Sequence, residues 1–195
     1  MTITITRLSG DAMRARLDDL ARLRLTVFRD WPYLYEGTMD HERTYIPRYD
    51  AARTGTLIVA QDGDAVVGAA TALGLDEESP MVQAPFLAAG LDMSRIFYFG
   101  ESVLLSRYRG QGIGVRFFAE REAAARAHGY AQACFCGVAR PADHPARPAD
   151  YVPLDDFWKK RGYEKRPELV SQFSWQDIGD TEQTIKPMVY WMKTL

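Results

Sequence analysis

The sequence predicts one α/β (α+β) domain, residues 1–195, in which strands and helices pack around a single core. Three observations lead to this class: an alternating strand followed by an amphipathic helix near the start, a strand–Asp-Gly–strand hairpin, and a strand–glycine turn–helix unit in the middle. A chain of 195 residues is long enough for one such core. Glycine, proline and charge are spread evenly, without a repeat or a linker, so we expect no second domain.

The first elements are a strand and two helices. Residues 2–6 (TITIT) alternate between threonine and isoleucine, which is typical of a strand with one buried face. Asp11 can cap a helix whose apolar side chains recur at helical spacing, namely Met13, Leu17, Leu20, Leu23 and Val27. A short second helix is predicted within residues 38–49, before Pro47. His41 in that helix is interpreted as a solvated residue rather than a catalyst.

The hairpin follows. Residues 56–61 and 65–71 are apolar strands joined across Asp62–Gly63–Asp64, and Asp-Gly is a strong hairpin signal. Residues 75–90 are a connection that we expect to be partly helical. Its three acids (Asp76, Glu77 and Glu78) could steer a cationic amine, but a solvated charged loop is the favoured interpretation.

The middle and the end of the chain alternate between strands and helices. Apolar and aromatic residues without a helical period predict a strand over 96–105, and an Ala-, Arg- and Glu-rich helix follows the glycine turn and ends near His128–Gly129. Residues 130–138 predict the next strand. After a proline-rich loop, 154–163 read as an Asp-capped helix ending at glycine. Two more strands are predicted near 169–175 and 187–193.

The glycine turn suggests an anion-binding site. Gly110, Gly112 and Gly114 leave the turn almost bare of side chains, at a helix start whose free N–H groups favour pyrophosphate. A tight turn without a ligand is the alternative. The dinucleotide fingerprint fails, because Val115 occupies its third glycine position and the acid expected about twenty residues later is missing. A dinucleotide oxidoreductase is therefore a weak hypothesis. No G-x-x-x-x-G-K-S/T loop is present, so nucleotide triphosphate hydrolysis gets no support.

Residues 100–114 (GESVLLSRYRGQGIG) resemble the acyl-CoA-binding signature of the GNAT superfamily of N-acetyltransferases. Its pattern Q/R-x-x-G-x-G/A falls on Arg109, Gly112 and Gly114. The resemblance implies a mixed, mostly antiparallel central sheet flanked by helices, with the central strand splayed from its neighbour. It also implies acetyl-CoA as cosubstrate, with the pyrophosphate held by Arg109, Gly110, Gln111, Gly112, Ile113 and Gly114. The pantetheine arm would run beside Val103, Leu104 and Leu105.

The resemblance implies an acyltransferase (EC 2.3.1.-) that moves an acetyl group directly to a primary amine of a small molecule or peptide. The amine must lose a proton before it attacks the thioester. Glu101, an acid in an apolar strand, is the candidate general base, with a pKa that burial would raise. The alternative is that Glu101 pairs with a cation, or binds the amine without taking its proton. The backbone N–H of Leu104 is the candidate donor to the developing oxyanion.

The general acid is not predicted. Family members frequently place a tyrosine on the late helix, but Trp158 occupies that position here. Tyr151 or Tyr163 could substitute, or the thiolate could leave unassisted. A coenzyme A-binding sensor or interaction module without catalysis is therefore kept as a second hypothesis.

An aromatic segment between the first two helices is the candidate acceptor site. The resemblance implies that Trp31, Tyr33 and Tyr35 form a wall of the pocket, and a packed aromatic cluster is the alternative. Pro32 disfavours helix at Trp31, which suggests a loop.

Composition limits the classes of partner that we expect. The net charge of −2 argues against nucleic acid, and neither a membrane span nor a secretion signal is seen. Cys134 and Cys136 have no metal-ligand companion, so we expect no metal, and they are interpreted as core residues in a reducing cytoplasm. A homodimer is left open.

Overall fold

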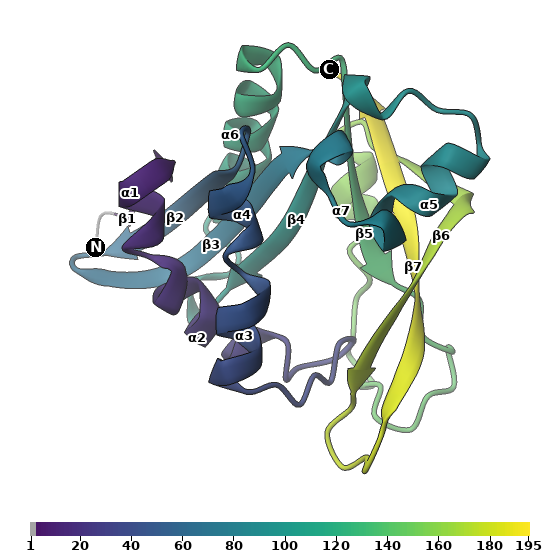
Figure 1. Ribbon diagram of the computed structural model, residues 1–195. Helices are drawn as coiled ribbons and strands as arrows, with labels where there is room; N and C mark the ends of the chain where they lie inside the picture. The colour runs from purple at the N-terminus through teal and green to yellow at the C-terminus, as the bar shows by residue number, and fades with distance from the viewer. Residues whose placement is uncertain (1–2) are drawn as a thin grey trace.

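A computed structural model describes residues 3–195 and shows one seven-stranded sheet flanked by helices (Figure 1). The strand order is β1-β2-β3-β4-β5-β7-β6, and only the β4–β5 pair is parallel. The predicted mixed, mostly antiparallel sheet is therefore confirmed. Thr2, where the first predicted strand begins, lies outside the described residues. The strands are β1 Ile3–Leu8, β2 Thr56–Asp62, β3 Ala65–Gly74, β4 Ile96–Leu104, β5 Gln132–Val138, β6 Glu164–Gln176 and β7 Gln183–Thr194.

One of the predicted helices is broken. The helix expected from Asp11 to Val27 is interrupted at Ala15–Arg16, where the Arg16 amide bonds the carbonyl of Met13 in a tighter turn. The short helix predicted before Pro47 is observed at Met39–Tyr45, and a further short helix, Arg48–Ala51, follows Pro47, which has no N–H to continue the first. The helices are α1 Gly10–Arg14, α2 Leu17–Val27, α3 Met39–Tyr45, α4 Arg48–Ala51, α5 Pro80–Ala88, α6 Ile113–Ala127 and α7 Asp155–Lys159.

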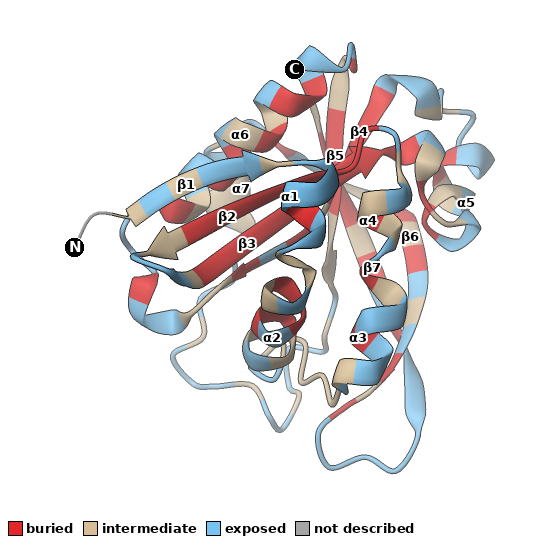
Figure 2. Cartoon of the chain, turned by 60° about the vertical axis from the view of Figure 1, so that its left-hand side comes forward, coloured by how far each residue is buried: buried red, intermediate tan, exposed pale blue. Residues whose placement is uncertain are grey.

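Helices cover both faces of the sheet (Figures 1 and 2). On one face α2, α4 and α5 pack on the strands, with Leu20 and Phe86 fully buried. On the other face α6 and α7 enclose a second cluster, which includes Phe118 and the half-buried Trp158. Strands β2, β3 and β4 are mostly buried between these layers, so burial of apolar side chains on both faces holds this part of the sheet.

The sheet opens at its centre. β5 pairs with β4 only at residues 96–98, and the two strands then separate. On the other side of β4, the register against β3 shifts between Ala70 and Ala72, because β4 carries an extra residue near Gly100–Glu101. This bulge lies where β4 has lost its parallel neighbour, so backbone groups of residues 100–104 that do not bond β3 are free to face ligands.

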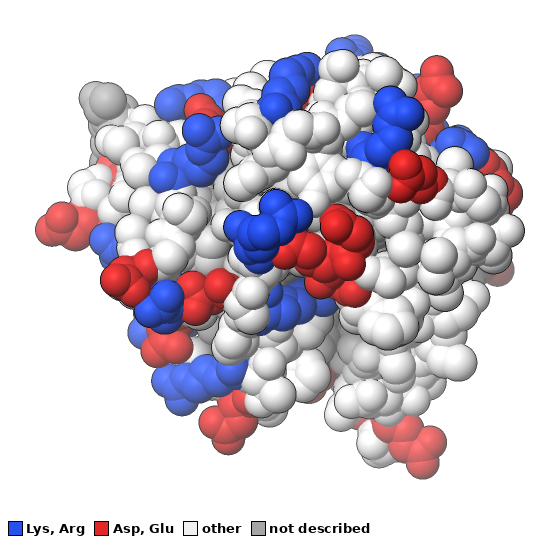
Figure 3. All heavy atoms as spheres, turned by 45° about the horizontal axis from the view of Figure 1, so that its top comes forward, with Lys and Arg blue, Asp and Glu red and all other residues white. Residues whose placement is uncertain are grey.

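The surface does not gather one sign of charge. On the face drawn in Figure 3, basic and acidic side chains are intermingled. Within residues 3–195, no helix is both long and apolar enough to cross a membrane.

Candidate active site

The glycine turn has the backbone conformation that its sequence predicts. A short 3₁₀ turn over 106–108 leads from β4 into the turn, and Gly110 and Gly112 both have φ of +77°. This left-handed conformation favours glycine. Gly112 is the N-cap of α6, and a side chain added to it would meet no atom of the protein within 4 Å. The space over the turn is therefore open.

The turn presents a run of free backbone donors. The first amide of α6 that bonds back to the turn is that of Arg116, which donates to Gly112 at 3.2 Å. Among the described residues, no hydrogen-bond acceptor is found for the amides of residues 110–115. These donors stand at the N-terminus of a 15-residue helix, where the helix dipole also favours a negative charge. Chemically, the turn suits an anion such as a diphosphate.

The end of β4 also presents free backbone groups. The amide of Leu105 donates to Val67 in β3 at 3.0 Å. Because hydrogen bonding alternates along an antiparallel pair, the amides of Ser102 and Leu104 face away from β3, toward the gap that β5 leaves. The Val103 side chain is fully buried in the core, and the same alternation turns its amide toward β3.

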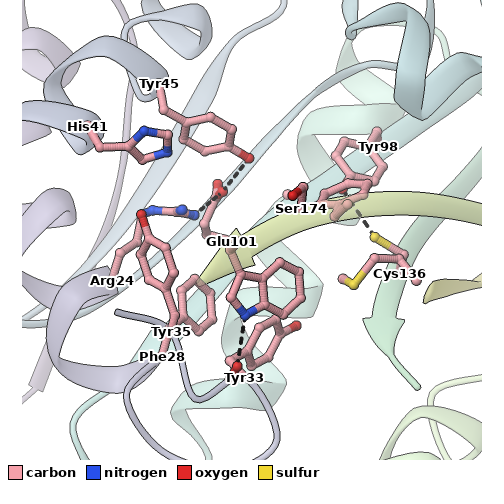
Figure 4. Close-up of a pocket in the computed structure, with 14 residues that line it drawn as sticks. Arg24, Phe28, Tyr33, Tyr35, His41, Tyr45, Tyr98, Glu101, Cys136 and Ser174 are labelled. Carbon is pink, nitrogen blue, oxygen red and sulfur yellow. Dashed lines mark hydrogen bonds and ion pairs between the residues drawn. The ribbon is translucent and has the colours of Figure 1, made fainter. Parts of the chain in front are cut away.

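Glu101 lies at the bulge and is buried, with 5% of its surface exposed. Its carboxylate accepts hydrogen bonds from the guanidinium of Arg24 and the hydroxyl of Tyr49, from the Thr71 hydroxyl at 2.6 Å, and from the Tyr45 hydroxyl at 3.2 Å. Two donors meet each oxygen, and a carboxylate offers about four lone-pair sites. The carboxylate is therefore saturated, and Figure 4 shows two of its donors, Arg24 and Tyr45.

The raised pKa predicted for Glu101 is wrong. Burial does act to raise its pKa, but the guanidiniums of Arg24 and Arg48, with the hydrogen bonds from Thr71 and Tyr49, outweigh burial and lower the pKa to about 2. The alternative of pairing with a cation is what the Arg24 contact shows.

A buried chain of charges extends to either side of Glu101. Arg24 also donates to Glu42 at 2.5 Å, and Arg48, whose guanidinium lies 3.9 Å from Glu101, donates to Glu78 at 3.2 Å. Glu78 is only 6% exposed, so its interpretation as part of a solvated loop is wrong. Burial raises the pKa of Glu78. Three carboxylates thus share two guanidiniums in a largely water-free region.

A pocket of about 130 Å³ lies beside Glu101. Tyr33 and Tyr35 line it. Trp31 does not, and packs instead against His144 and Tyr151 in the loop of residues 139–154 between β5 and α7 (the outer loop). The lining side chains come from α2, α3, the loop after α2, and strands β4, β5, β6 and β7, and Figure 4 draws them as sticks. The lining residues are Arg24, Phe28, Tyr33, Tyr35, His41, Tyr45, Tyr98, Gly100, Glu101, Cys136, Phe173, Ser174, Trp175 and Met188.

Arg140 holds the loop between α2 and α3, which contains Trp31, Tyr33 and Tyr35 (the aromatic loop), against the sheet. Its guanidinium donates to the carbonyls of Pro32 and Tyr33 at 2.8 and 2.7 Å, and to both oxygens of Asp177 at 2.6 and 2.8 Å. The Trp175 indole also donates to the Tyr33 carbonyl at 3.0 Å. These contacts hold the loop against the end of β6, which fixes one wall of the pocket.

The three residues considered for the role of general acid do not line this pocket. Trp158 packs in the core against Phe135 and Trp191, and the Tyr163 hydroxyl donates to Glu122 at 3.1 Å. Tyr151 is in the outer loop, against Trp31.

Comparison with known proteins agrees with this geometry. The family model described as "Acetyltransferase (GNAT) family" matches residues 20–149. Among curated proteins, no similar sequence is found. Solved structures share the fold at low sequence identity. A ribosomal-protein-alanine N-acetyltransferase from Brucella melitensis has a TM-score of 0.62 and 15% identity, covering 98% of this chain and 99% of its own.

Two further structures cover the whole of this chain. An N-acetyltransferase from Staphylococcus aureus Mu50 has a TM-score of 0.61 and 12% identity, with 99% of its own chain covered. The PaiA N-acetyltransferase from Thermoplasma acidophilum, in complex with coenzyme A, has a TM-score of 0.58 and 12% identity, with 100% of its own chain covered.

The fold, the glycine turn and the family match together define the class of protein. The chain belongs to the GNAT family of acetyltransferases. It is therefore an acyltransferase of the class EC 2.3.1.-, and members of this family transfer acetyl groups to amines.

Proposed function

We propose that this protein transfers the acetyl group of acetyl-CoA directly to a primary amine of a small molecule or peptide. The observation that carries the proposal is that the two halves of the site meet on one strand. The free amides of residues 110–115 follow the end of β4, and the bulge at Gly100–Glu101 on the same strand lines the pocket. A coenzyme held by the turn and extended along β4 would bring its thioester to an amine in the pocket.

Each part of the turn and strand has a role in this proposal. The amides of residues 110–115 bind the pyrophosphate, with Arg109 beside them, and the gap-facing amides of Ser102 and Leu104 guide the pantetheine arm. Holding amine and thioester together removes the entropy of their encounter. When the amine nitrogen attacks the carbonyl carbon, the Leu104 amide stabilises the negative oxygen, the carbon–sulfur bond breaks, and the thiolate leaves.

The base role of Glu101 stays a prediction, and two observations argue against it. Its pKa of about 2 makes it a weak base, and its oxygens already accept bonds from four donors. We propose that Glu101 instead holds Arg24 and Tyr45 in place at the edge of the pocket. The thiolate would leave without an acid, since an ordinary thiol has a pKa of about 8.5.

Direct transfer is supported by the state of the two cysteines. Cys134 is fully buried and burial raises its pKa well above the usual range, whereas Cys136 is half-buried with a pKa raised to about 12. Neither thiol is prepared to act as a nucleophile, because the thiolate is the reactive form.

Thiol release from acetyl-CoA in the presence of primary amines tests the proposal. We expect release that depends on the amine, with the acetylated amine identified by mass spectrometry. Coenzyme A binding without turnover for any amine would favour the silent binding module. Acetylated protein at Cys134 or Cys136 on the way to product would contradict direct transfer.

A further inference from the structure

The acceptor pocket is the size of one ring. Its volume of about 130 Å³ is close to that of an engineered cavity of about 150 Å³ in another protein, which holds one benzene. Its walls are mainly aromatic and apolar side chains, namely Phe28, Tyr33, Tyr35, Tyr45, Tyr98, Phe173, Trp175 and Met188. A compact apolar group therefore fills the space, and a larger one would extend beyond it.

Most polar groups in these walls already have partners within the protein. The Tyr35 hydroxyl donates to Glu42 at 3.0 Å, and the Tyr45 hydroxyl donates to Glu101. Tyr98 and Cys136 form a contact of 3.4 Å. A ligand with several amide or hydroxyl groups would lose its bonds to water without gaining replacements, which is costly in a buried site.

The charges beside the pocket oppose an acidic acceptor. The Arg24 guanidinium is already flanked by two carboxylates, those of Glu42 and Glu101. A carboxylate on the acceptor would add a third negative charge next to them. A single ammonium group, in contrast, is favoured by the faces of the surrounding aromatic rings.

Resting on the proposed acetyl transfer, we propose that the acceptor is a small primary monoamine whose tail is one aromatic ring, or a branched apolar group of similar size, without a carboxylate. Ring and ammonium together satisfy the volume, the paired polar walls and the balanced charges.

A panel of amines that differ by one feature tests this proposal by thiol release from acetyl-CoA. We expect kcat/KM for phenethylamine to exceed that for ethylamine by about 100-fold, which corresponds to about 2.7 kcal/mol and lies within the range for burying one phenylalanine-sized side chain. Phenylalanine differs from phenethylamine only by its carboxylate, and we expect it to be at least about 100-fold poorer. Tryptamine tests a second fused ring, and a peptide starting with alanine tests a polar backbone. Phenylalanine or the peptide equalling phenethylamine would overturn the proposal.

Binding of the same amines to the protein saturated with coenzyme A separates this proposal from the proposed function. If no amine releases thiol, acetyl transfer fails. Calorimetry still tests the acceptor class, because tighter binding of phenethylamine than of phenylalanine supports it and the reverse order overturns it.

A pair of variants locates the preference in the pocket. Phe173→Ala enlarges the lining, and we expect kcat/KM for tryptamine to rise at least tenfold relative to phenethylamine. Ile185→Ala is the control, because Ile185 lies on the neighbouring strand, is 67% exposed and does not line the pocket. An unchanged ratio in the folded Phe173→Ala protein would overturn the assignment of the ring to this pocket.

A separate observation concerns His41, which lines the pocket and is also exposed to solvent. Its ring stacks on Tyr45 at 6.3 Å and meets the edge of Tyr35 at 6.5 Å. Among the described residues, no hydrogen-bond partner is found for its ring nitrogens. Glu101, in contrast, has no free lone pair.

We infer that His41 accepts the proton of the bound ammonium group. A neutral imidazole nitrogen takes the proton, and the amine lone pair is then free to attack the thioester. The groups that face His41 are the phenols of Tyr35 and Tyr45, and the charged groups lining the pocket are Arg24 and Glu101.

The dependence of kcat/KM on pH tests this inference with three variants. We expect His41→Gln to lower kcat/KM at pH 7 about 100-fold and to move the acidic limb of the profile to higher pH, since the amine must then lose its proton to water. His144→Gln, in the outer loop, should leave the profile unchanged. If His41→Gln keeps the wild-type profile, or Glu101→Gln alone removes its acidic limb, the inference is overturned.

Discussion

The two ends of the site are built in opposite ways. The proposed coenzyme end is one contiguous turn, residues 109–114, and it offers backbone amides that any sequence with glycines in these places could present. The acceptor end collects side chains from α2, α3, a loop and four strands, and depends on a buried network of charges. The contrast indicates that the coenzyme end can be retained while the acceptor end changes, because the two ends share only β4.

Removing Arg24, at the acceptor end, should have the largest effect. Arg24→Met leaves the buried carboxylate of Glu42 without a cation and that of Glu101 with only Arg48 at 3.9 Å, and we expect the free energy of unfolding to fall by about 3–5 kcal/mol. Urea denaturation measures this change. Arg22→Met, on the same helix with a 62% exposed side chain, should cost less than about 1 kcal/mol. Equal losses would contradict a special role for the buried pair.

Acid should weaken the same network through Glu101. Its pKa is lowered from 4.5 to about 2 in the folded protein, so its stabilising contribution is complete above pH 4.5 and is lost as pH falls toward 2. The shift corresponds to about 3 kcal/mol. We expect urea denaturation between pH 5 and 2 to show this loss in the wild type and not in Glu101→Gln. Parallel pH curves for the two proteins would show that the ion pair does not lower this pKa.

The coenzyme end should be broken by one added side chain. Gly112→Val places a branched group over the free amides, and we expect affinity for coenzyme A to fall about 100-fold, or about 2.7 kcal/mol. Gly129→Val is a matched control at the other end of α6, since Gly129 also has positive φ (+84°) and open space around it. Both variants carry similar backbone strain. Calorimetry showing equal affinities would disprove binding at the turn.

Loosening the aromatic loop should have the smallest effect. Arg140→Ala removes the bonds to Pro32, Tyr33 and Asp177 that position the pocket wall, and we expect KM for the amine to rise about tenfold while affinity for coenzyme A is retained. Steady-state kinetics and calorimetry measure the two quantities. Equal losses in both would indicate general destabilisation instead of a local effect on the acceptor wall.

The contrast between the two ends of the site also explains which features could be predicted from the sequence. The glycine turn, the hairpin and the central strand depend on local patterns, and all three appear where the sequence places them. The environment of Glu101 depends on Arg24, Tyr45, Tyr49 and Thr71, which lie 30 to 77 residues away along the chain, so its lowered pKa could not be foreseen.

Arg24 was not predicted as a site residue, although the sequence contains an indication of its role. It falls four residues after Leu20 on the apolar face of its helix, where a charge predicts a buried partner. The sequence contains no such indication for Arg140, because nothing in the proline-rich segment around it identifies Asp177 or the Tyr33 carbonyl as its partners.

Backbone amide NMR shifts during titration with coenzyme A test the central claim most directly. If the free amides hold the diphosphate, the signals of residues 110–115 should move most, together with those of Ser102 and Leu104 at the gap, whereas the Gly129 amide at the far end of α6 should stay in place. Saturable binding that leaves the 110–115 amides unmoved would contradict the account.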